Sequence, residues 1–177
     1  MLERILSKKK IETIFIKLSF NLISLCYLAF ICFLIFDSIS QIVPNFKFNM
    51  IYLISVCVCS DIGGFIFGKI FKGQKLTKIS PRKTVSGSLG SFILPLGLVP
   101  FFYYFVGFDI FELLFILIIV SFFCQTGDIF ISYLKRKAKL KDTGRFLPGH
   151  GGMLDRIDGI LFAIPLGTFA WKVLLAI

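Results

Sequence analysis

The sequence predicts an all-α protein that is built into a membrane: a polytopic helix bundle of about five transmembrane helices. Of its 177 residues, 56% are hydrophobic and only 17% are charged, whereas a soluble domain is about 45–50% apolar and about 25% charged. One spanning helix uses roughly 20 mostly apolar residues, so five spans would account for nearly all the apolar residues of this chain. The composition therefore argues against a soluble globular domain and against a cysteine-dense secreted scaffold.

Each predicted span is a long apolar run between polar connections. The first run is too long for the core of a signal peptide and has no A-x-A-type cleavage site, so we interpret it as a retained span. Pro95 and Pro100 predict kinks in the third span. A very short turn at 107–109 precedes the fourth span, whose helix is expected to continue through 128–140. The spans are expected at about residues 14–36, 50–70, 88–106, 110–127 and 157–175.

The distribution of charge predicts the orientation of the chain. The net charge is +10, and 17 of the 20 basic residues fall in three segments, 1–12, 69–83 and 135–156. All three segments lie on one side of the membrane if the N-terminus is cytoplasmic, which agrees with the positive-inside rule. We therefore expect the N-terminus inside and the C-terminus outside. We interpret the positive charge as an orientation signal and expect no nucleic-acid partner.

A carboxylate inside the second predicted span is the first candidate for function. Asp61 lies about halfway along that span, and an ionisable residue within a membrane is costly enough to indicate a functional role. Small residues follow it at Gly63, Gly64 and Gly68, which would let a second backbone or a ligand approach closely. Asp61 could pair with a lysine of a neighbouring helix, but these glycines favour a polar cavity open to the cytoplasm.

A second group of polar residues follows the fourth span. Asp155 and Asp158 are three apart at the head of the last span, where acidic side chains suit a helix N-terminus. A glycine-rich turn at 148–152 lies between the two helices. The residues on the fourth helix recur at the spacing of a single face: Asp128, Ser132, Lys135 and Arg136.

These residue types suit a metal–phosphate site. Carboxylates without a Cys or His cluster are typical ligands of a hard cation such as Mg²⁺, which also binds substrate phosphates. The nearby cations would neutralise a polyphosphate, as phosphoryl or nucleotidyl transfer requires. The alternative is a set of positive-inside lysines with a few surface acids, which does not explain acids at both helix–membrane junctions.

The segment from 132 to 158 reads SYLKRKAKLKDTGRFLPGHGGMLDRID, and Gly127-Asp128 stands just before it. This pattern resembles the signature of the phosphatidate cytidylyltransferases, or CDP-diacylglycerol synthases. Over these residues we find no departure from the family pattern. The resemblance extends from about residue 50 to the C-terminus. Family members are typically longer, with additional N-terminal spans, so we expect this chain to correspond to the family core with one preceding span.

The resemblance includes a second segment, which also shows two departures. Asp61, the pair at 68–69 and the run ISPRKT at 79–84 fit the family pattern. The Gly-Phe pair at 64–65 stands where the family usually has Ala-Tyr. Ser86 stands where the family usually has Glu.

The resemblance implies an integral membrane enzyme that transfers a cytidylyl group from CTP to phosphatidic acid, giving CDP-diacylglycerol and pyrophosphate for phospholipid biosynthesis. We assign Asp128 and Asp155 to Mg²⁺, with Asp158 as an accessory ligand and a second, monovalent cation as a further hypothesis. The expected catalytic set is Asp128, Asp155, Lys135, Arg136 and Arg156. The expected substrate-binding set is Asp61, Ser80, Arg82, Lys83, Ser132, Lys141, Arg145, His150, Gly151 and Gly152.

The resemblance to the phosphatidate cytidylyltransferases also implies how the chain is organised and which molecules it binds. Residues 1–49 would form a cytoplasmic stub, the first span and an outer loop. Residues 50–177 would form the catalytic membrane core, with cytoplasmic loops at 69–87 and 128–158. We expect CTP, phosphatidic acid and the lipid bilayer as partners. The expected location is the bacterial inner (cell) membrane with the active site facing the cytoplasm, and a homodimer is a further hypothesis.

Three alternatives stay open at this point. A related lipid nucleotidyl- or phosphotransferase would use a different lipid acceptor, because contacts with lipid tails leave no specific pattern in a sequence. A small membrane transporter would use Asp61, although transporters place their substrate sites near the bilayer midplane. An inactive paralogue would account for Ser86 in place of the family Glu.

Overall fold

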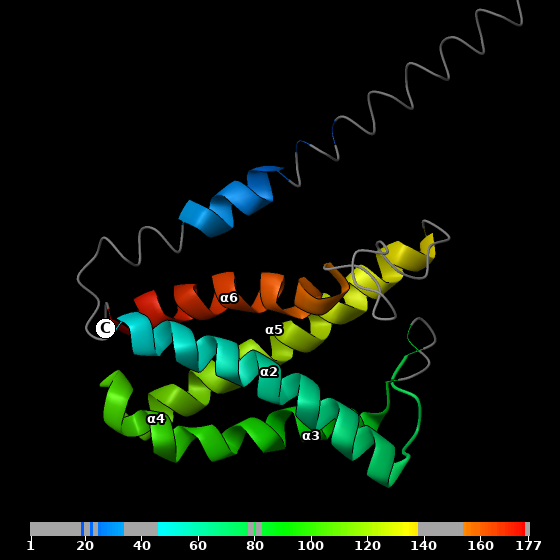
Figure 1. Ribbon diagram of the computed structural model, residues 1–177, viewed down its shortest axis with the longest axis horizontal. Coiled ribbons are helices and arrows are strands. Elements are labelled where there is room, and N and C mark those ends of the chain that lie inside the picture. The colour runs from blue at the N-terminus through cyan, green and yellow to red at the C-terminus, as the bar shows by residue number, and fades with distance from the viewer. Residues whose placement is uncertain are drawn as a thin grey trace, which may run out of the picture.

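The computed structural model describes residues 19, 22, 25–33, 46–77, 80, 83–137 and 154–175, with side chains left out at 46 and 154–157. The described part is almost entirely helical, and the only β contact within it is an isolated antiparallel bridge between Lys75 and Thr84. The helices pack side by side as one bundle (Figure 1). In chain order they are α2 (Phe46–Phe71), α3 (Val85–Ile93), the 3₁₀ segment η1 (Leu94–Leu98), α4 (Val99–Val106), α5 (Ile110–Lys137) and α6 (Leu154–Leu175).

Four of the five predicted spans are confirmed as helices long and apolar enough to cross a membrane. They are Lys47–Phe71, Val85–Val106, Ile110–Lys137 and Asp158–Leu175. The predicted first span at 14–36 is only partly described. Its helical residues 25–33 lie beside α6 and are inclined to it (Figure 1). The Tyr27 hydroxyl donates a hydrogen bond of 2.7 Å to the carbonyl of Leu161 in α6.

The sequence predicts kinks at the two prolines of the third span, and the structure has a change of helix type there. Pro95 lies in the first turn of η1, and Pro100 lies in the first turn of α4. A proline lacks the N–H group that would continue the α-helical hydrogen bonds, so α3 ends at Ile93 and the chain passes through a 3₁₀ segment. Gly107, with φ of 79°, then ends α4 in the left-handed conformation that glycine adopts most readily.

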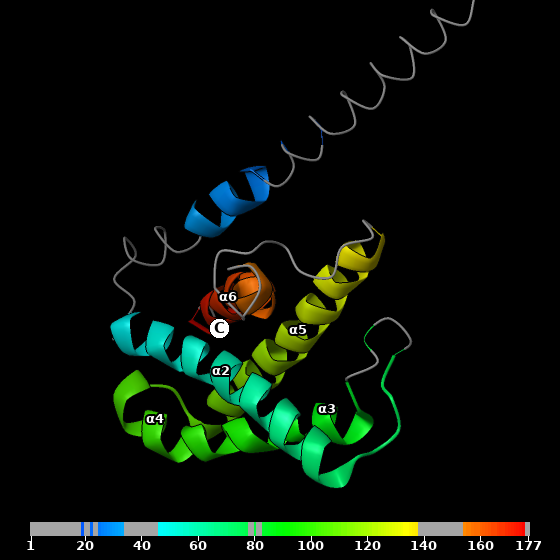
Figure 2. The same cartoon turned by 45° about the vertical axis from the view of Figure 1, so that its right-hand side comes forward.

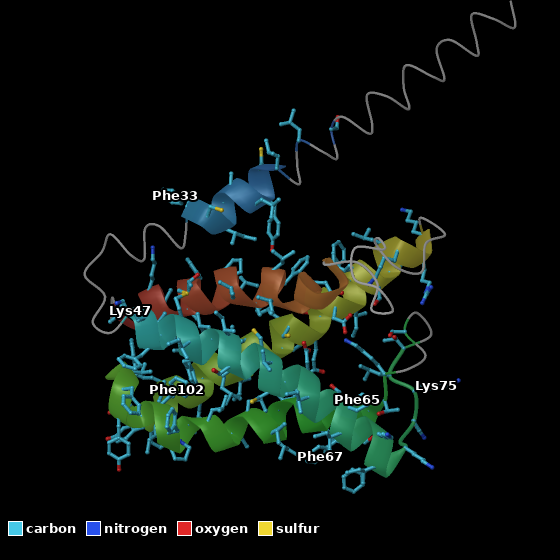
Figure 3. All side chains as sticks on the ribbon, viewed as in Figure 1. Phe33, Lys47, Phe65, Phe67, Lys75 and Phe102 are labelled. Carbon is cyan, nitrogen blue, oxygen red and sulfur yellow. The ribbon has the colours of Figure 1, made fainter. Side chains whose placement is uncertain are left out.

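The apolar core fills the end of the bundle where α2 begins and α6 ends. Tyr52 is fully buried there, and its hydroxyl donates a hydrogen bond of 2.8 Å to the carbonyl of Leu113. The rings of Phe102 and Trp171 pack against it, with centroids 5.1 and 6.0 Å away. This packing holds α2, α4, α5 and α6 together at one end of the bundle (Figure 3, where Phe102 marks this end).

A close backbone contact joins α2 to α3 near the other end. Gly63, Gly64 and Gly68 of α2 face Gly87 and Gly90 of α3. An added Cβ on Gly87 would lie 2.6 Å from the carbonyl oxygen of Gly64, and one on Gly63 would collide with the carbonyl of Gly90. Small residues at such positions let membrane helices approach closely. The glycines that the sequence placed near Asp61 therefore bring a second helix to its side.

Substitution of Gly63 by Ala is expected to lower the stability of the protein by about 1–3 kcal/mol, because the added methyl group must push the α3 backbone away. Thermal unfolding in detergent measures this loss. Gly97→Ala is the matched control, because no atom lies within 4 Å of a Cβ added there. Equal stability of the two variants would contradict the close helix contact.

Candidate functional site

A polar cavity of about 360 Å³ opens between α2, α3, α5, α6 and the segment that joins α2 to α3. It lies toward the end of the bundle opposite the aromatic core, beside the connecting segment that Lys75 marks in Figure 3. Its walls bring together residues that are far apart in the sequence. The lining residues are Asp61, Gly64, Phe65, Leu76, Ser80, Lys83, Thr84, Gly87, Ser88, Ser91, Gln125, Asp128 and Asp158.

The segment that connects α2 to α3 turns back along itself (Figure 2), and we call its described residues, 72–77, 80, 83 and 84, the strap. Leu76, Ser80, Lys83 and Thr84 of the strap line one side of the cavity. Two backbone hydrogen bonds close it: Leu76 N–H donates to Lys83 O at 2.8 Å, and Val85 N–H donates to Gln74 O at 2.9 Å. Thr84 then starts α3 as its N-cap, because its hydroxyl accepts a hydrogen bond of 3.1 Å from Gly87 N–H. The strap thereby places Lys83 at the cavity wall.

Lys83 and Asp128 form an ion pair inside the cavity. The Nζ atom of Lys83 lies 2.5 Å from Oδ2 of Asp128, and it also donates to the backbone carbonyl of Gln125 at 3.4 Å. The other oxygen of Asp128 accepts a hydrogen bond of 3.5 Å from the Ser132 hydroxyl, one turn along α5. The sequence assigned Lys83 and Asp128 to the same site, and the structure brings them into direct contact.

Gln125 is a lining residue that the sequence analysis missed. Its Oε1 accepts a hydrogen bond of 2.6 Å from the Ser88 hydroxyl, and its Nε2 donates to the Ser88 carbonyl at 3.4 Å. This double contact fixes α3 against α5 beside Lys83. Its only sequence signal was a single amide three residues before Asp128, at the end of an apolar run.

Asp61 lies in the cavity wall, where the sequence analysis expected it. The thiol of Cys124 donates a weak hydrogen bond of 3.6 Å to its Oδ1. Asp61 comes from α2 and Asp128 from α5, so the two carboxylates reach the same space from different helices. A substrate-binding role for Asp61 stays a prediction.

Asp158 enters the same cavity from α6 and is paired with Lys135 of α5. The Nζ atom of Lys135 lies 3.7 Å from Oδ2 of Asp158, and Gly159 N–H donates to Oδ1 at 2.9 Å. The sequence analysis gave Lys135 to catalysis, whereas the structure shows it in contact with a carboxylate of the neighbouring helix. Arg136, the next residue, is exposed. Neither of these two cations belongs to the described cavity lining.

Several expected site residues lie outside the described part of the chain. The side chains of Asp155 and Arg156, in the first turn of α6, lie outside the described part of the chain. The remaining residues of the substrate-binding set that lie outside it are Arg82, Lys141, Arg145, His150, Gly151 and Gly152.

Ser86, the residue at the second departure from the family pattern, contacts the strap. Ser86 does not line the cavity but holds the strap: its hydroxyl oxygen accepts a hydrogen bond of 3.3 Å from Gly73 N–H and lies 3.2 Å from the Thr84 hydroxyl oxygen. The contacts of Ser86 in this chain are therefore with the strap that carries Lys83.

The donors in the cavity suit a hard divalent cation. Carboxylates from three helices line it, together with serine hydroxyls. Among the described side chains, no three His, Cys, Asp or Glu residues converge closely enough to hold a metal by themselves. Mg²⁺ does not need such a cage, because it usually binds through one or two carboxylates and keeps water and substrate phosphates as its other ligands. Asp61, Asp128 and Asp158 therefore fit Mg²⁺ by the chemistry of their oxygens.

Comparison with known proteins gives one family. A family model described as "Cytidylyltransferase family" matches residues 3–174. The phosphatidate cytidylyltransferase of Staphylococcus haemolyticus is 42% identical over 120 residues, which is 66% of this chain and 46% of that protein. The enzyme of the same name from Staphylococcus saprophyticus is 38% identical over 167 residues, 92% of this chain and 61% of that protein. That of Helicobacter pylori is 41% identical over 118 residues, 64% of this chain and 43% of that protein. The chain thus spans less than two thirds of the length of these relatives.

Proposed function

Because the chain belongs to the cytidylyltransferase family, we propose that it transfers a cytidylyl group from CTP to phosphatidic acid and releases pyrophosphate. The observation that carries this proposal is the single cavity that Asp61, Asp128, Asp158 and Lys83 line near one end of the bundle. The names of the relatives support the choice of phosphatidic acid as the acceptor.

The reaction joins two anions, and the cavity offers groups that offset their repulsion. A phosphate oxygen of phosphatidic acid forms a bond to the α-phosphorus of CTP, and the bond from that phosphorus to the pyrophosphate oxygen breaks. Lys83 would hold a phosphate of the nucleotide, since its ammonium group faces the cavity. The carboxylates of Asp128 and Asp158 would hold Mg²⁺ together with Asp155, and a monovalent cation is the second ion we propose. When bound, Mg²⁺ would stabilise the negative charge on the reacting phosphates.

The cavity also adjoins the surface where a lipid would lie. Phe65 lines the cavity, yet 70% of its surface is exposed, and it stands on the outer side of α2 between the exposed residues Ile62 and Ile66. A phosphate head group could therefore reach Asp61 and Lys83 while its acyl chains stay in the bilayer. This continuity supports a lipid acceptor over a soluble one.

We propose that the site faces the cytoplasm of a bacterial cell from its inner membrane. Basic residues gather at the site end of the bundle. Lys69 lies in the last turn of α2, Lys72 and Lys75 follow in the strap, and three more basic residues lie in the last turn of α5. Lys47 lies at the opposite end, as Figure 3 shows for Lys47 and Lys75. The positive-inside rule places the lysine-rich end in the cytoplasm, where CTP is available.

A homodimer is the oligomeric state we propose. Large apolar side chains such as Tyr104 and Phe111, each 84% exposed, stand on the outer surface of α4 and α5. Such side chains can contact lipid or a second copy of the chain. Measurement of the native mass in mild detergent would distinguish contact with lipid from contact with a second copy. A mass of one chain alone would contradict the proposed homodimer.

The transfer assay tests the proposed function directly. The full chain, purified in detergent, is mixed with labelled CTP, Mg²⁺ and phosphatidic acid, and the labelled lipid product is separated and measured. We expect labelled CDP-diacylglycerol, with no product when Mg²⁺ is replaced by a chelator. A panel of other phosphorylated lipids serves as the comparison. Product from another acceptor but not from phosphatidic acid would correct the substrate, and absence of product from every acceptor would contradict the activity.

A further inference from the structure

The ion pair between Lys83 and Asp128 places a cation on the carboxylate that we assign to the metal. The Nζ atom lies 2.5 Å from Oδ2 of Asp128. Both side chains are partly exposed to solvent, at 26% and 32%. Asp128 therefore already has a counter-ion supplied by the chain itself.

The position of that ammonium group is built into the fold. Lys83 N–H donates a hydrogen bond of 3.1 Å to Ser80 O, and Lys83 O accepts one of 2.8 Å from Leu76 N–H, so both sides of its backbone are held in the strap. Its Nζ also donates to the backbone carbonyl of Gln125, which is held within helix α5. A lysine on an open surface would lack these hydrogen bonds to its backbone and its ammonium group. The strap therefore holds this one within reach of Asp128.

Two positive charges cannot share one carboxylate without repulsion. An ammonium group and a divalent cation that both approach Asp128 would lie within a few ångströms of each other, where Coulomb repulsion is strong in a partly buried site. The flexible four-carbon stem of lysine allows the ammonium group to move away while the backbone stays in place. Asp61 and Asp158 line the same cavity, so a displaced ammonium group stays in a negatively charged space.

We propose that Lys83 is an internal counter-ion of Asp128 that a divalent cation displaces, and that the displaced ammonium group then holds a phosphate of the nucleotide. The second half rests on the proposed function, and the first does not. A bound divalent cation frees the Lys83 ammonium group to hold the nucleotide, and a bound nucleotide keeps that group away from Asp128. The divalent cation and the nucleotide therefore each strengthen the binding of the other. Such coupling is reciprocal by thermodynamic necessity.

The test measures metal binding without CTP or lipid. Mn²⁺ binding to the full chain in detergent is followed by the loss of the free Mn²⁺ signal in electron paramagnetic resonance. Lys83→Met is expected to bind Mn²⁺ about tenfold more tightly than the wild type, because the competing charge is gone. Lys83→Arg, which keeps the charge, is expected to stay near the wild type.

Lys75→Met is the matched control, since it removes the same charge from the same strap at an exposed residue outside the cavity. It is expected to change Mn²⁺ affinity by less than about twofold, because exposed charges at a distance are screened. A second measurement follows CTP affinity at saturating Mn²⁺, which Lys83→Met should lower. Loss of a residue with only a structural role would not raise the affinity for Mn²⁺ while it lowers the affinity for CTP.

Unchanged or weaker Mn²⁺ binding in Lys83→Met, or an equal gain in Lys75→Met, would overturn the proposal. Absence of saturable Mn²⁺ binding in both the wild type and Lys83→Met would overturn it as well. Failure of the transfer assay alone would not, because the Mn²⁺ measurement involves neither substrate. The two hypotheses therefore fail separately.

Discussion

Replacement of Asp128 by Asn is expected to lower the rate of cytidylyl transfer by about 10²–10³-fold, as the loss of one group that stabilises transition-state charge typically does. Asp128 contacts both Lys83 and Ser132 in the cavity. Asn has nearly the same shape, but it lacks the negative charge that attracts the Lys83 ammonium group and, in its place, a divalent cation. Initial rates with labelled CTP at several Mg²⁺ concentrations measure the effect.

Asp109→Asn is the control for this prediction. Asp109 is an exposed acid beside the other end of α5, and its replacement makes the same chemical change outside the cavity. We expect this variant to keep nearly full activity. If Asp128→Asn kept more than about a tenth of the wild-type rate, a difference of less than about 1.4 kcal/mol in the barrier, the assignment of Asp128 to the metal would be wrong.

Replacement of Asp158 by Asn is expected to lower the stability of the protein by about 3 kcal/mol or more, because it removes one partner of a buried ion pair. The side chains of Asp158 and Lys135 are only 10% and 14% exposed. The remaining ammonium group of Lys135 would keep its charge in a site where little water can reach it. Thermal unfolding in detergent without divalent cations measures the loss and keeps metal binding out of the comparison.

A double replacement separates the pair from the individual residues. Lys135→Met combined with Asp158→Asn removes both charges, and we expect it to regain most of the stability that the single Asp158 variant loses. Arg136→Met is the control, since Arg136 is the exposed neighbour and its replacement should change stability by less than about 0.5 kcal/mol. A double variant as unstable as Asp158→Asn would contradict the pairing.

Helix positions were predictable because they depend on local composition. The apolar runs after residue 46 locate α2, α5 and α6, and Pro95 and Pro100 locate the break between α3 and α4. The contact between Asp128 and Ser132 was also predictable from their spacing on one helix.

Contacts between helices were not predictable in this way. Lys135 shares the spacing pattern of Asp128 but reaches across to Asp158 of α6, and the spacing on α5 carries no information about its neighbour. Gln125 was missed for the same reason, because its partner Ser88 lies on α3. The pairing of Lys83 with Asp128 depends on the fold of the strap, whose backbone hydrogen bonds leave little trace in the sequence.

The glycine contact between α2 and α3 limits how the cavity can change shape. The backbone carbonyls of Gly63 and Gly64 lie against Gly90 and Gly87 of α3, so no side chain separates the two helices at these contacts and little is left there to absorb a shift. The α2 wall of the cavity, which carries Asp61, and the α3 wall, which follows the strap, should therefore move as a single rigid body. Adaptation to ligands of different size would then fall to α5 and α6, which carry Asp128 and Asp158.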